Sequence, residues 1–496
     1  MVTRLVAVAG LALWTFAIPA VTGPPGAPGT PSALAGEASA TVYWTASGGA
    51  VSNYTVTASP GGANATVGGS SISAVVSGLS DGTSYTFGVT ASNGSGPGPA
   101  SAASNSVVPG RGAYQALVPA RILDSRLTAG TLGAGSSLNV QVLGQGGVPA
   151  SGVSAVMLNV TVTDTTAPSF LIVWPAGLPQ PLASNLNWTA GKTVPNLVQV
   201  ALGTGGKLSI YNQVGTTDVV IDVAGYIDAA TVTAQPDGLY HPVVPDRVLD
   251  TRSGNGAPQA QVGPGHTITV QMTGRGGSGI PAAGVSAVVL NVTVTNATAA
   301  SYLTVWPEGV QQPVASNLNF LAGQNTPNRV IVKLGSTGKV SFFNAAGSVD
   351  VIADVGGWFT DATPDGIGST FTGLTPARIL DTRPQSQVGP FSTPFGPRQT
   401  RNVVVAGQGQ VPSMNSTPQP TAVVLNVTVT NPTAPSFLTV WPSDAASQPT
   451  ASDLNYVAGQ TSPNLVVVRL GADGSVSLYN AAGSTDVIID VVGYYN

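Results

Sequence analysis

A charged hexapeptide of the form Arg-x-x-Asp-x-Arg occurs three times, at residues 121–126, 247–252 and 378–383. Two aspartates four residues apart follow each hexapeptide later in the chain, and their second members are Asp222, Asp354 and Asp490. Only 8% of the residues are charged, so charges that recur at every copy need a physical reason. Such groups can pair with one another, hold a polar ligand or, as two carboxylates, hydrolyse a glycosidic bond.

An ion-pair network within each copy is the simplest interpretation, because arginine donates two parallel hydrogen bonds to a carboxylate. On an extended strand, Asp124 and Arg126 point to one face and Arg121 to the other. A polar ligand pocket built from the same groups is the alternative. The predicted ion-pair residues are Arg121, Asp124, Arg126 and Asp222 in the first copy, Arg247, Asp250, Arg252 and Asp354 in the second, and Arg378, Asp381, Arg383 and Asp490 in the third.

The carboxylate spacing argues against glycoside hydrolysis. Asp218 and Asp222 are four residues apart, which separates their Cα atoms by about 13 Å on a strand that rises ~3.3 Å per residue. Glycosidases need carboxyl groups about 5 to 9.5 Å apart. The same pair also occurs in three copies, whereas a catalytic site is needed once. We therefore expect no enzyme and name no catalytic residue.

Aromatic and amide side chains recur near one another and are weak candidates for ligand binding. β-sandwich modules hold sugars by stacking them on aromatic rings and orienting them with amide hydrogen bonds. A large aromatic at the same place in every copy is more often part of a core, and we favour a core position for Trp174, Trp306 and Trp441. The amides are more often turn caps. The candidate ligand residues are Trp188, Phe320 and Tyr456 together with Asn187, Asn319 and Asn455.

No other chemistry stands out in the sequence. The chain has no cysteine and two histidines, His241 and His266, which have no equivalents in the other copies. We therefore expect no metal site and no cofactor. The net charge is −4 and no basic patch is present, which disfavours nucleic acid as a partner.

The strings around these residues define three tandem repeats. VMLNVTVTDTTAPSFLIVWP begins at Val156, and close copies begin at Val288 and Val423. Alternating apolar and polar residues between turns predict seven or eight strands per repeat and no helix. We expect three antiparallel β-sandwiches, jelly-roll-like, at residues 114–228, 240–359 and 371–496, joined by linkers. A single fold with threefold pseudosymmetry is the less favoured alternative, because each repeat is long enough to bury its own core.

Residues 31–109 form a further all-β unit. Alternating strands are separated by turns at the spacing of a β-sandwich. With Trp44, Tyr54 and the string Leu79-Ser-Asp-Gly-Thr-Ser-Tyr85, this segment resembles a fibronectin type III domain. The resemblance implies that the Tyr85 hydroxyl bonds back to the main chain. It implies almost nothing about a ligand.

The three repeats are similar to tandem β modules that trail secreted cell-wall hydrolases and surface proteins of actinobacteria. The matching strings include Pro-Ala-Arg-Ile-Leu-Asp-Thr-Arg383, Leu-Asn-Val-Thr-Val-Thr, Ser-Asn-Leu-Asn and Pro-Asn-Leu-Val. The resemblance implies an accessory extracellular module whose catalytic partner lies elsewhere.

The first 20 residues predict export. A short positive start is followed by an uncharged apolar run from Leu5 to Ala20, which is typical of a signal peptide. A Pro/Gly linker follows at 21–30. We expect a secreted protein, associated with the cell surface and free of the membrane once the signal is removed.

Together these patterns predict a non-catalytic surface or matrix protein that attaches to cell wall or extracellular polysaccharide. Copies tethered by short linkers would bind one surface with avidity. The alternatives are an accessory component of a glycan-degrading system and a structural surface protein that self-associates.

Overall fold

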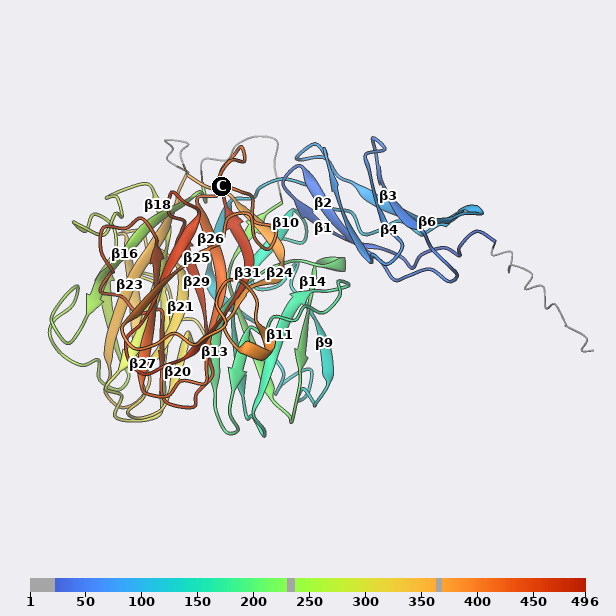
Figure 1. Cartoon of the computed structure of the whole chain (residues 1–496). Helices are drawn as coiled ribbons and strands as arrows, with labels where there is room; N and C mark the ends of the chain where they lie inside the picture. Colours follow the sequence, from blue (N-terminus) through green and yellow to red (C-terminus); the bar gives the residue numbers. More distant parts are fainter. Residues whose placement is uncertain (1–22, 230–236, 363–367) are drawn as a thin grey trace, which may run out of the picture.

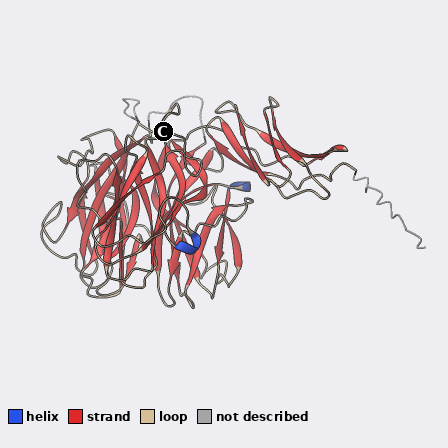
Figure 2. Cartoon of the chain, in the orientation of Figure 1, coloured by secondary structure: helices blue, strands red, loops and turns tan. Residues whose placement is uncertain are grey.

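The chain folds almost entirely into antiparallel β-sheets, as Figure 2 shows. The structure is a computed structural model and describes residues 23–229, 237–362 and 368–496. The predicted signal peptide therefore lies outside the described residues. In those ranges the only helical segments are two 3-10 turns, Thr204–Gly206 and Pro384–Ser386, and no helix is long and apolar enough to span a membrane. The all-β prediction is confirmed.

The N-terminal domain is a sandwich of a three-stranded and a four-stranded sheet. Trp44 packs on Tyr54 in its core, with ring centroids 5.2 Å apart. The Tyr85 hydroxyl accepts a hydrogen bond from the backbone N–H of Ser80 at 3.1 Å, which confirms the bond predicted for this tyrosine. The strands are β1 (Ser32–Gly36), β2 (Ser39–Tyr43) and β5 (Ser73–Ser77) in one sheet, and β3 (Asn53–Ser59), β4 (Asn64–Gly68), β6 (Thr86–Asn93) and β7 (Gly96–Ala100) in the other.

Each repeat contains eight strands. In repeat 1 they are β8 (Tyr114–Asp124), β9 (Ser136–Gln141), β10 (Val153–Thr163), β11 (Ser169–Pro175), β12 (Leu186–Trp188), β13 (Val194–Ala201), β14 (Lys207–Asn212) and β15 (Asp218–Asp228). In repeat 2 they are β16 (Tyr240–Asp250), β17 (His266–Gln271), β18 (Val285–Thr295), β19 (Ser301–Pro307), β20 (Leu318–Phe320), β21 (Thr326–Lys333), β22 (Lys339–Asn344) and β23 (Asp350–Thr360). In repeat 3 they are β24 (Phe371–Asp381), β25 (Gln399–Val404), β26 (Ala422–Thr430), β27 (Ser436–Pro442), β28 (Leu454–Tyr456), β29 (Ser462–Arg469), β30 (Ser475–Asn480) and β31 (Asp486–Tyr495).

The strand order in every repeat is that of a jelly roll. Repeat 1 has one sheet in the order β13-β10-β15-β8 and a second in the order β12-β11-β14-β9, and the other two repeats follow the same order. Counted along the repeat, these sheets read 6-3-8-1 and 5-4-7-2, which is the arrangement produced when one long hairpin rolls up. We call the first sheet the inner sheet and the second the outer sheet.

The inner sheets are buried on both faces. On β10, Val156, Leu158 and Val160 point into the core of repeat 1, whereas Ala155 and Met157 point the other way. That other face meets the inner sheets of repeats 2 and 3 in a common core. Because every side chain from Ala155 to Val162 is buried, this part of the strand is a nearly continuous apolar run, as in strands that are covered on both sides.

Aromatic rings fill one end of this common core. They come from the first residue of each repeat and from the end of the last strand in repeats 2 and 3, where repeat 1 has Ile227 instead. Tyr114 of repeat 1 contacts Phe359 of repeat 2 with centroids 4.3 Å apart, and Tyr240 of repeat 2 contacts Tyr495 of repeat 3 at 4.4 Å. These rings are at most 1% exposed, so they hold the three repeats together through a dry core.

Asparagine side chains join the repeats nearer the other end. Asn328 of repeat 2 donates to Asn159 of repeat 1 at 2.9 Å and accepts the backbone N–H of Leu197 at 3.1 Å. Asn159 in turn donates to the Ser316 carbonyl at 2.6 Å. The equivalent bonds link repeat 3 to repeat 2 and repeat 1 to repeat 3, through Asn464, Asn291, Arg329 and Ser452, and through Asn196, Asn426, Leu465 and Ser184.

The three repeats therefore form one closed body with threefold pseudosymmetry, seen as the crowded group of sheets in Figure 1. Each repeat keeps its own sandwich core. The expectation of separate modules on linkers is wrong, because the inner sheets leave an apolar face that only the neighbouring repeats cover.

Candidate functional site

The recurring charges lie at the junctions between repeats. Arg121 donates two hydrogen bonds to Asp222 across β8 and β15, at 2.9 and 3.2 Å. Arg126 donates two hydrogen bonds to the Asp124 carboxylate, at 2.8 and 2.6 Å, and the Arg121 guanidinium lies 3.5 Å from the same carboxylate. The same pairs form in the other repeats, between Arg247, Asp250, Arg252 and Asp354 and between Arg378, Asp381, Arg383 and Asp490.

Two of these arginines also reach into the next repeat. Arg247 donates to the Thr450 carbonyl of repeat 3 at 2.7 Å, and Arg378 donates to the Leu182 carbonyl of repeat 1 at 3.3 Å. The network therefore joins neighbouring repeats as well as the two edges of one inner sheet. The sequence did not indicate this second role, because the carbonyl partners carry no residue-type signal.

Burial and pairing act in opposite directions on the carboxyls. Burial raises the pKa of Asp222, and the hydrogen bonds from Arg121 oppose that shift. The hydrogen bonds from Arg126 lower the pKa of Asp124, which lies closer to solvent. Each of these carboxylates has a guanidinium partner, so the geometry is that of a structural ion-pair network.

The three aromatic ligand candidates point into the cores of their repeats and not toward solvent. Trp188, Phe320 and Tyr456 are 5%, 4% and 4% exposed and belong to the cores of their own repeats. A sugar cannot stack on a ring that is covered on both faces. The ligand role considered for them is therefore corrected: they are core residues, because they share the inward face of a short strand with a leucine.

The amide candidates point outward. Asn187, Asn319 and Asn455 are half-buried, and each bonds to the hydroxyl of the serine three residues earlier, at 3.0 to 3.2 Å. Their side chains lie on the outer face of the outer sheet. Asn185 and Asn317, two residues earlier in the chain, are buried, and each accepts a hydrogen bond from a backbone N–H of the neighbouring strand.

An aromatic pair lies beside each of these amides and was missed from the sequence. In register, Phe170 faces Asn187, Tyr302 faces Asn319 and Phe437 faces Asn455. A second ring on the next strand completes the pair. Tyr302 and Phe343 have centroids 6.3 Å apart, and Phe437 and Tyr479 have centroids 6.2 Å apart. The equivalent ring in repeat 1 is Tyr211.

We call each group of one amide and two rings an outer row. The three outer rows are Asn187, Phe170 and Tyr211; Asn319, Tyr302 and Phe343; and Asn455, Phe437 and Tyr479. Five of the six aromatic residues are partly exposed, and Tyr302 is 40% exposed. The signal that could have found them is the pleat: on β11, Leu171 and Val173 point into the core, so Phe170 must point out.

The tryptophans that we expected in the core lie near the C-terminal ends of β11, β19 and β27. Trp174, Trp306 and Trp441 are each 6% exposed. Trp174 donates to the Leu178 carbonyl at 3.0 Å, so the loop after the strand folds back over the ring. The core position expected for these residues is confirmed by their burial.

Histidines and carboxylates form no metal centre in the part of the chain that the structure describes, where no three such groups are placed to hold an ion. His241 stacks on Trp358 with centroids 3.9 Å apart. His266 is bonded to the Pro264 carbonyl at 2.9 Å.

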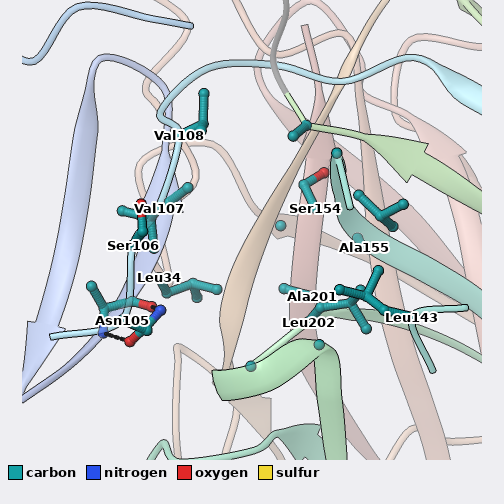
Figure 3. A pocket seen from close by; sticks show the side chains of 18 of the residues that line it. Leu34, Asn105, Ser106, Val107, Val108, Leu143, Ser154, Ala155, Ala201 and Leu202 are labelled. Atoms are coloured by element: carbon teal, nitrogen blue, oxygen red, sulfur yellow. Dashed lines mark hydrogen bonds between the residues drawn. The ribbon is translucent and has the colours of Figure 1, made fainter. Parts of the chain in front are cut away.

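A pocket of about 270 Å³ lies where the N-terminal domain meets repeats 1 and 3. Figure 3 shows Leu34 and Val107 on one side and Leu143 and Ala201 on the other. None of the described residues that line it is charged. The Asn105 side-chain oxygen accepts a hydrogen bond from the Ala33 N–H at 2.8 Å, and its amide nitrogen donates to the Ala33 carbonyl at 3.0 Å. The pocket is thus a gap between packed domains that lacks convergent polar groups.

Residues 26–107 match the sequence model of the fibronectin type III domain. No curated protein matches the chain. Among solved structures, the chain is similar to the FN1–FN3 domains of chicken CNTN1 (16% identity, 68% of this chain and 95% of that one, TM-score 0.17). It is also similar to a two-domain fibronectin type III segment of chicken tenascin, with 18% identity over 40% of this chain and 90% of that one and a TM-score of 0.15. A third similar structure is an archaeal virus protein described by its triple jelly roll fold, with 11% identity over 78% of this chain and 89% of that one and a TM-score of 0.15.

TM-scores this low carry no weight for function. The fibronectin match rests on 82 of 496 residues and therefore describes one domain. The chain contains a fibronectin type III domain, followed by three jelly-roll repeats that close into one body.

Proposed function

We propose that this protein is secreted, has no catalytic role, and attaches to cell wall or extracellular polysaccharide through its outer rows. The observation that supports this most is the outward placement of two partly exposed aromatic rings beside an asparagine amide in all three repeats. Aromatic faces pack against the C–H faces of sugar rings, and neighbouring amides orient the hydroxyl groups.

The strands beneath the outer rows favour such a role. Phe437 and Tyr479 lie on adjacent strands, β27 and β30, which pair from Leu438↔Asn480 to Pro442↔Val476, and Phe437 is paired with Asn455 of β28. A ring held by paired strands loses little conformational entropy when a ligand stacks on it. On the edge strand, β25, Asn402 is exposed and accepts a hydrogen bond from the buried hydroxyl of Ser477 on β30 at 2.8 Å. The row itself carries no charge, which suits an uncharged sugar chain.

The test is retention of the full mature chain on insoluble chitin, cellulose and purified bacterial cell walls. We expect retention on at least one of them. The triple variant Phe170→Ala, Tyr302→Ala and Phe437→Ala should bind about 2- to 13-fold more weakly, because each row loses one ring and stacking contributes about 0.5 to 1.5 kcal/mol per ring.

A matched control removes exposed apolar side chains outside the rows, one in each repeat. Leu127→Ala, Val310→Ala and Val457→Ala together should leave retention unchanged, since these residues are 80%, 44% and 56% exposed at other sites. Equal retention of the two triple variants would refute the role of the outer rows. Failure of the wild type to bind any of the three materials would refute the proposed function.

Secretion is part of the proposal and rests on the first 20 residues of the sequence. Intact-mass measurement of the protein in culture medium should find the chain shortened by roughly 20 to 25 residues, the usual length of a signal peptide. Recovery of only the full-length mass from membranes would contradict this.

Self-association is a second candidate, favoured by the free edges of the outer sheets. β9, β17 and β25 each end an outer sheet. Open edge strands can pair with another chain. Sedimentation at rising concentration would show oligomers if these edges pair, and a constant monomer mass would exclude this candidate.

A further inference from the structure

We infer that the molecule is a three-way cross-linker, which bridges separate polysaccharide chains and does not clamp onto one surface. This inference rests on the proposed function, because it requires the outer rows to bind sugar. It concerns what the closed body does with three such sites.

Closure fixes the directions in which the rows point. The inner sheet of each repeat turns one face toward the pseudosymmetry axis, where the common core lies. Its other face packs on the outer sheet of the same repeat, as Val156 and Leu158 do in repeat 1. The outward face of each outer sheet is the face turned away from its own repeat's core, and in repeat 1 Phe170 and Tyr211 lie at the margin of the common core, next to Ile172 and Trp174. Three repeats around one axis give three outer rows that face in three different directions.

The repeats cannot swing to bring the rows together. In each junction a backbone N–H, that of Leu197, Arg329 or Leu465, donates to an asparagine side-chain oxygen of the neighbouring repeat. The aromatic rings at the other end of the axis are fully buried. Reorienting one repeat would expose this core to water and leave the buried amides without hydrogen-bond partners, and both changes are unfavourable.

The N-terminal domain leaves row 1 accessible. It packs beside repeats 1 and 3, where the Tyr43 hydroxyl lies 2.7 Å from that of Thr375 and Asn496 donates to Glu37 at 2.7 Å. Figure 1 shows it at the upper end of the body, to one side. With this domain in place, Phe170 and Tyr211 are partly buried against the cluster that includes Leu34, and each keeps part of its surface exposed. All three rows are thus available in the whole chain.

Diverging rows change what three copies achieve. Avidity is lost when geometry forbids simultaneous engagement of one target. A flat glycan surface can meet only one row of this molecule at a time. Separate chains in solution or in a loose matrix can each occupy a different row, so the molecule joins them into a network.

The experiment uses the full chain with glycol chitin and hydroxyethyl cellulose, two soluble uncharged polymers. Affinity electrophoresis measures binding, and viscosity and turbidity measure cross-linking. Variants with two rows removed, such as Tyr302→Ala with Phe437→Ala, retain one row. We expect them to bind roughly threefold more weakly than the wild type, in proportion to the number of rows. We also expect them to raise neither viscosity nor turbidity, whereas the wild type should raise both.

Each outcome separates the inference from the proposed function. Binding of a polymer by the wild type without any rise in viscosity or turbidity would overturn cross-linking and leave attachment standing. A loss of one hundredfold or more on insoluble chitin when two rows are removed would also overturn it, since that loss means all rows engage one surface. Absence of binding to both soluble and insoluble polymers would refute the proposed function itself.

Discussion

Arg329 and Asp453 break the pseudosymmetry at the residue scale. Arg329 occupies the axial position held by Leu197 and Leu465, and Asp453 occupies the position of Asn185 and Asn317. The two side chains meet at 2.5 Å across the junction of repeats 2 and 3 and are 4% and 6% exposed. Burial raises the pKa of Asp453, and Arg329 opposes the shift. The arginine that replaces leucine is thus paired with the aspartate that replaces asparagine, so neither charge is buried at the axis without its partner.

A double-mutant cycle tests this pairing. Asp453→Asn alone should lower the free energy of unfolding by about 3 to 5 kcal/mol, because it leaves a buried guanidinium unpaired. Arg329→Leu with Asp453→Asn recreates the residues of the other two junctions and should recover most of that loss. Urea denaturation of the full chain measures both. Additive losses in the double variant would show that the two residues are not coupled.

The carboxyl of Asp124 predicts a dependence on pH. The hydrogen bonds from Arg126 lower its pKa in the folded chain. Its contribution is therefore complete above the unfolded value of about 3.9 and is lost as the pH falls through the lower folded value. At pH 7 the wild type should exceed Asp124→Asn in unfolding free energy by about 1 to 3 kcal/mol. The difference should shrink below pH 4. A difference that stays constant down to pH 2 would contradict the assignment.

At the scale of elements, a glycine in the last strand of each repeat makes room for the first aromatic. A Cβ on Gly357 would lie 2.3 to 2.5 Å from the Tyr240 ring, and one on Gly225 would lie equally close to Tyr114. The ring cannot move aside, because the Tyr240 hydroxyl donates to the Gly356 carbonyl at 3.0 Å and the side chain is fully buried. The recurring Gly before a closing aromatic is thus a packing requirement of the common core.

Gly357→Ala should therefore destabilise the chain by about 1 to 3 kcal/mol, the usual effect of overpacking. Gly276→Ala is the matched control, since no atom lies within 4 Å of its added Cβ, and it should change stability by under about 0.5 kcal/mol. Thermal unfolding of both variants makes the comparison. Equal melting temperatures would show that the ring has room to shift.

The strands were predictable from the sequence, but which way each of their side chains points was only partly predictable. Alternation in Leu-Asn-Val-Thr-Val-Thr indicated a strand, but both of its faces are buried, so the pattern could not say that Asn159 lies at a junction between repeats. Trp188 and Phe170 are both aromatic in a strand, and composition alone did not separate the inward ring from the outward one. Their register, which comes from pairing with a neighbouring strand, decides it.

At the scale of the whole molecule, closure of the repeats was not predictable from their length. A repeat of this size can bury its own core, and each one does. The second apolar face of the inner sheet is what requires partners, and it becomes visible only once the strands are placed side by side. The asparagines and aromatics that occur once per repeat then form a ring of bonds in which each repeat contacts the next.

Hydrogen exchange at three backbone amides tests this closure most directly. Leu197, Arg329 and Leu465 lie on edge strands of the inner sheets, and each N–H donates to an asparagine of a neighbouring repeat at 3.1 to 3.2 Å. In a closed body these amides should exchange as slowly as those in the centre of the sheets and should slow or quicken together. If they exchange at the rate of exposed edge-strand amides while the sheet centres stay protected, the repeats are independent and the closed body is contradicted.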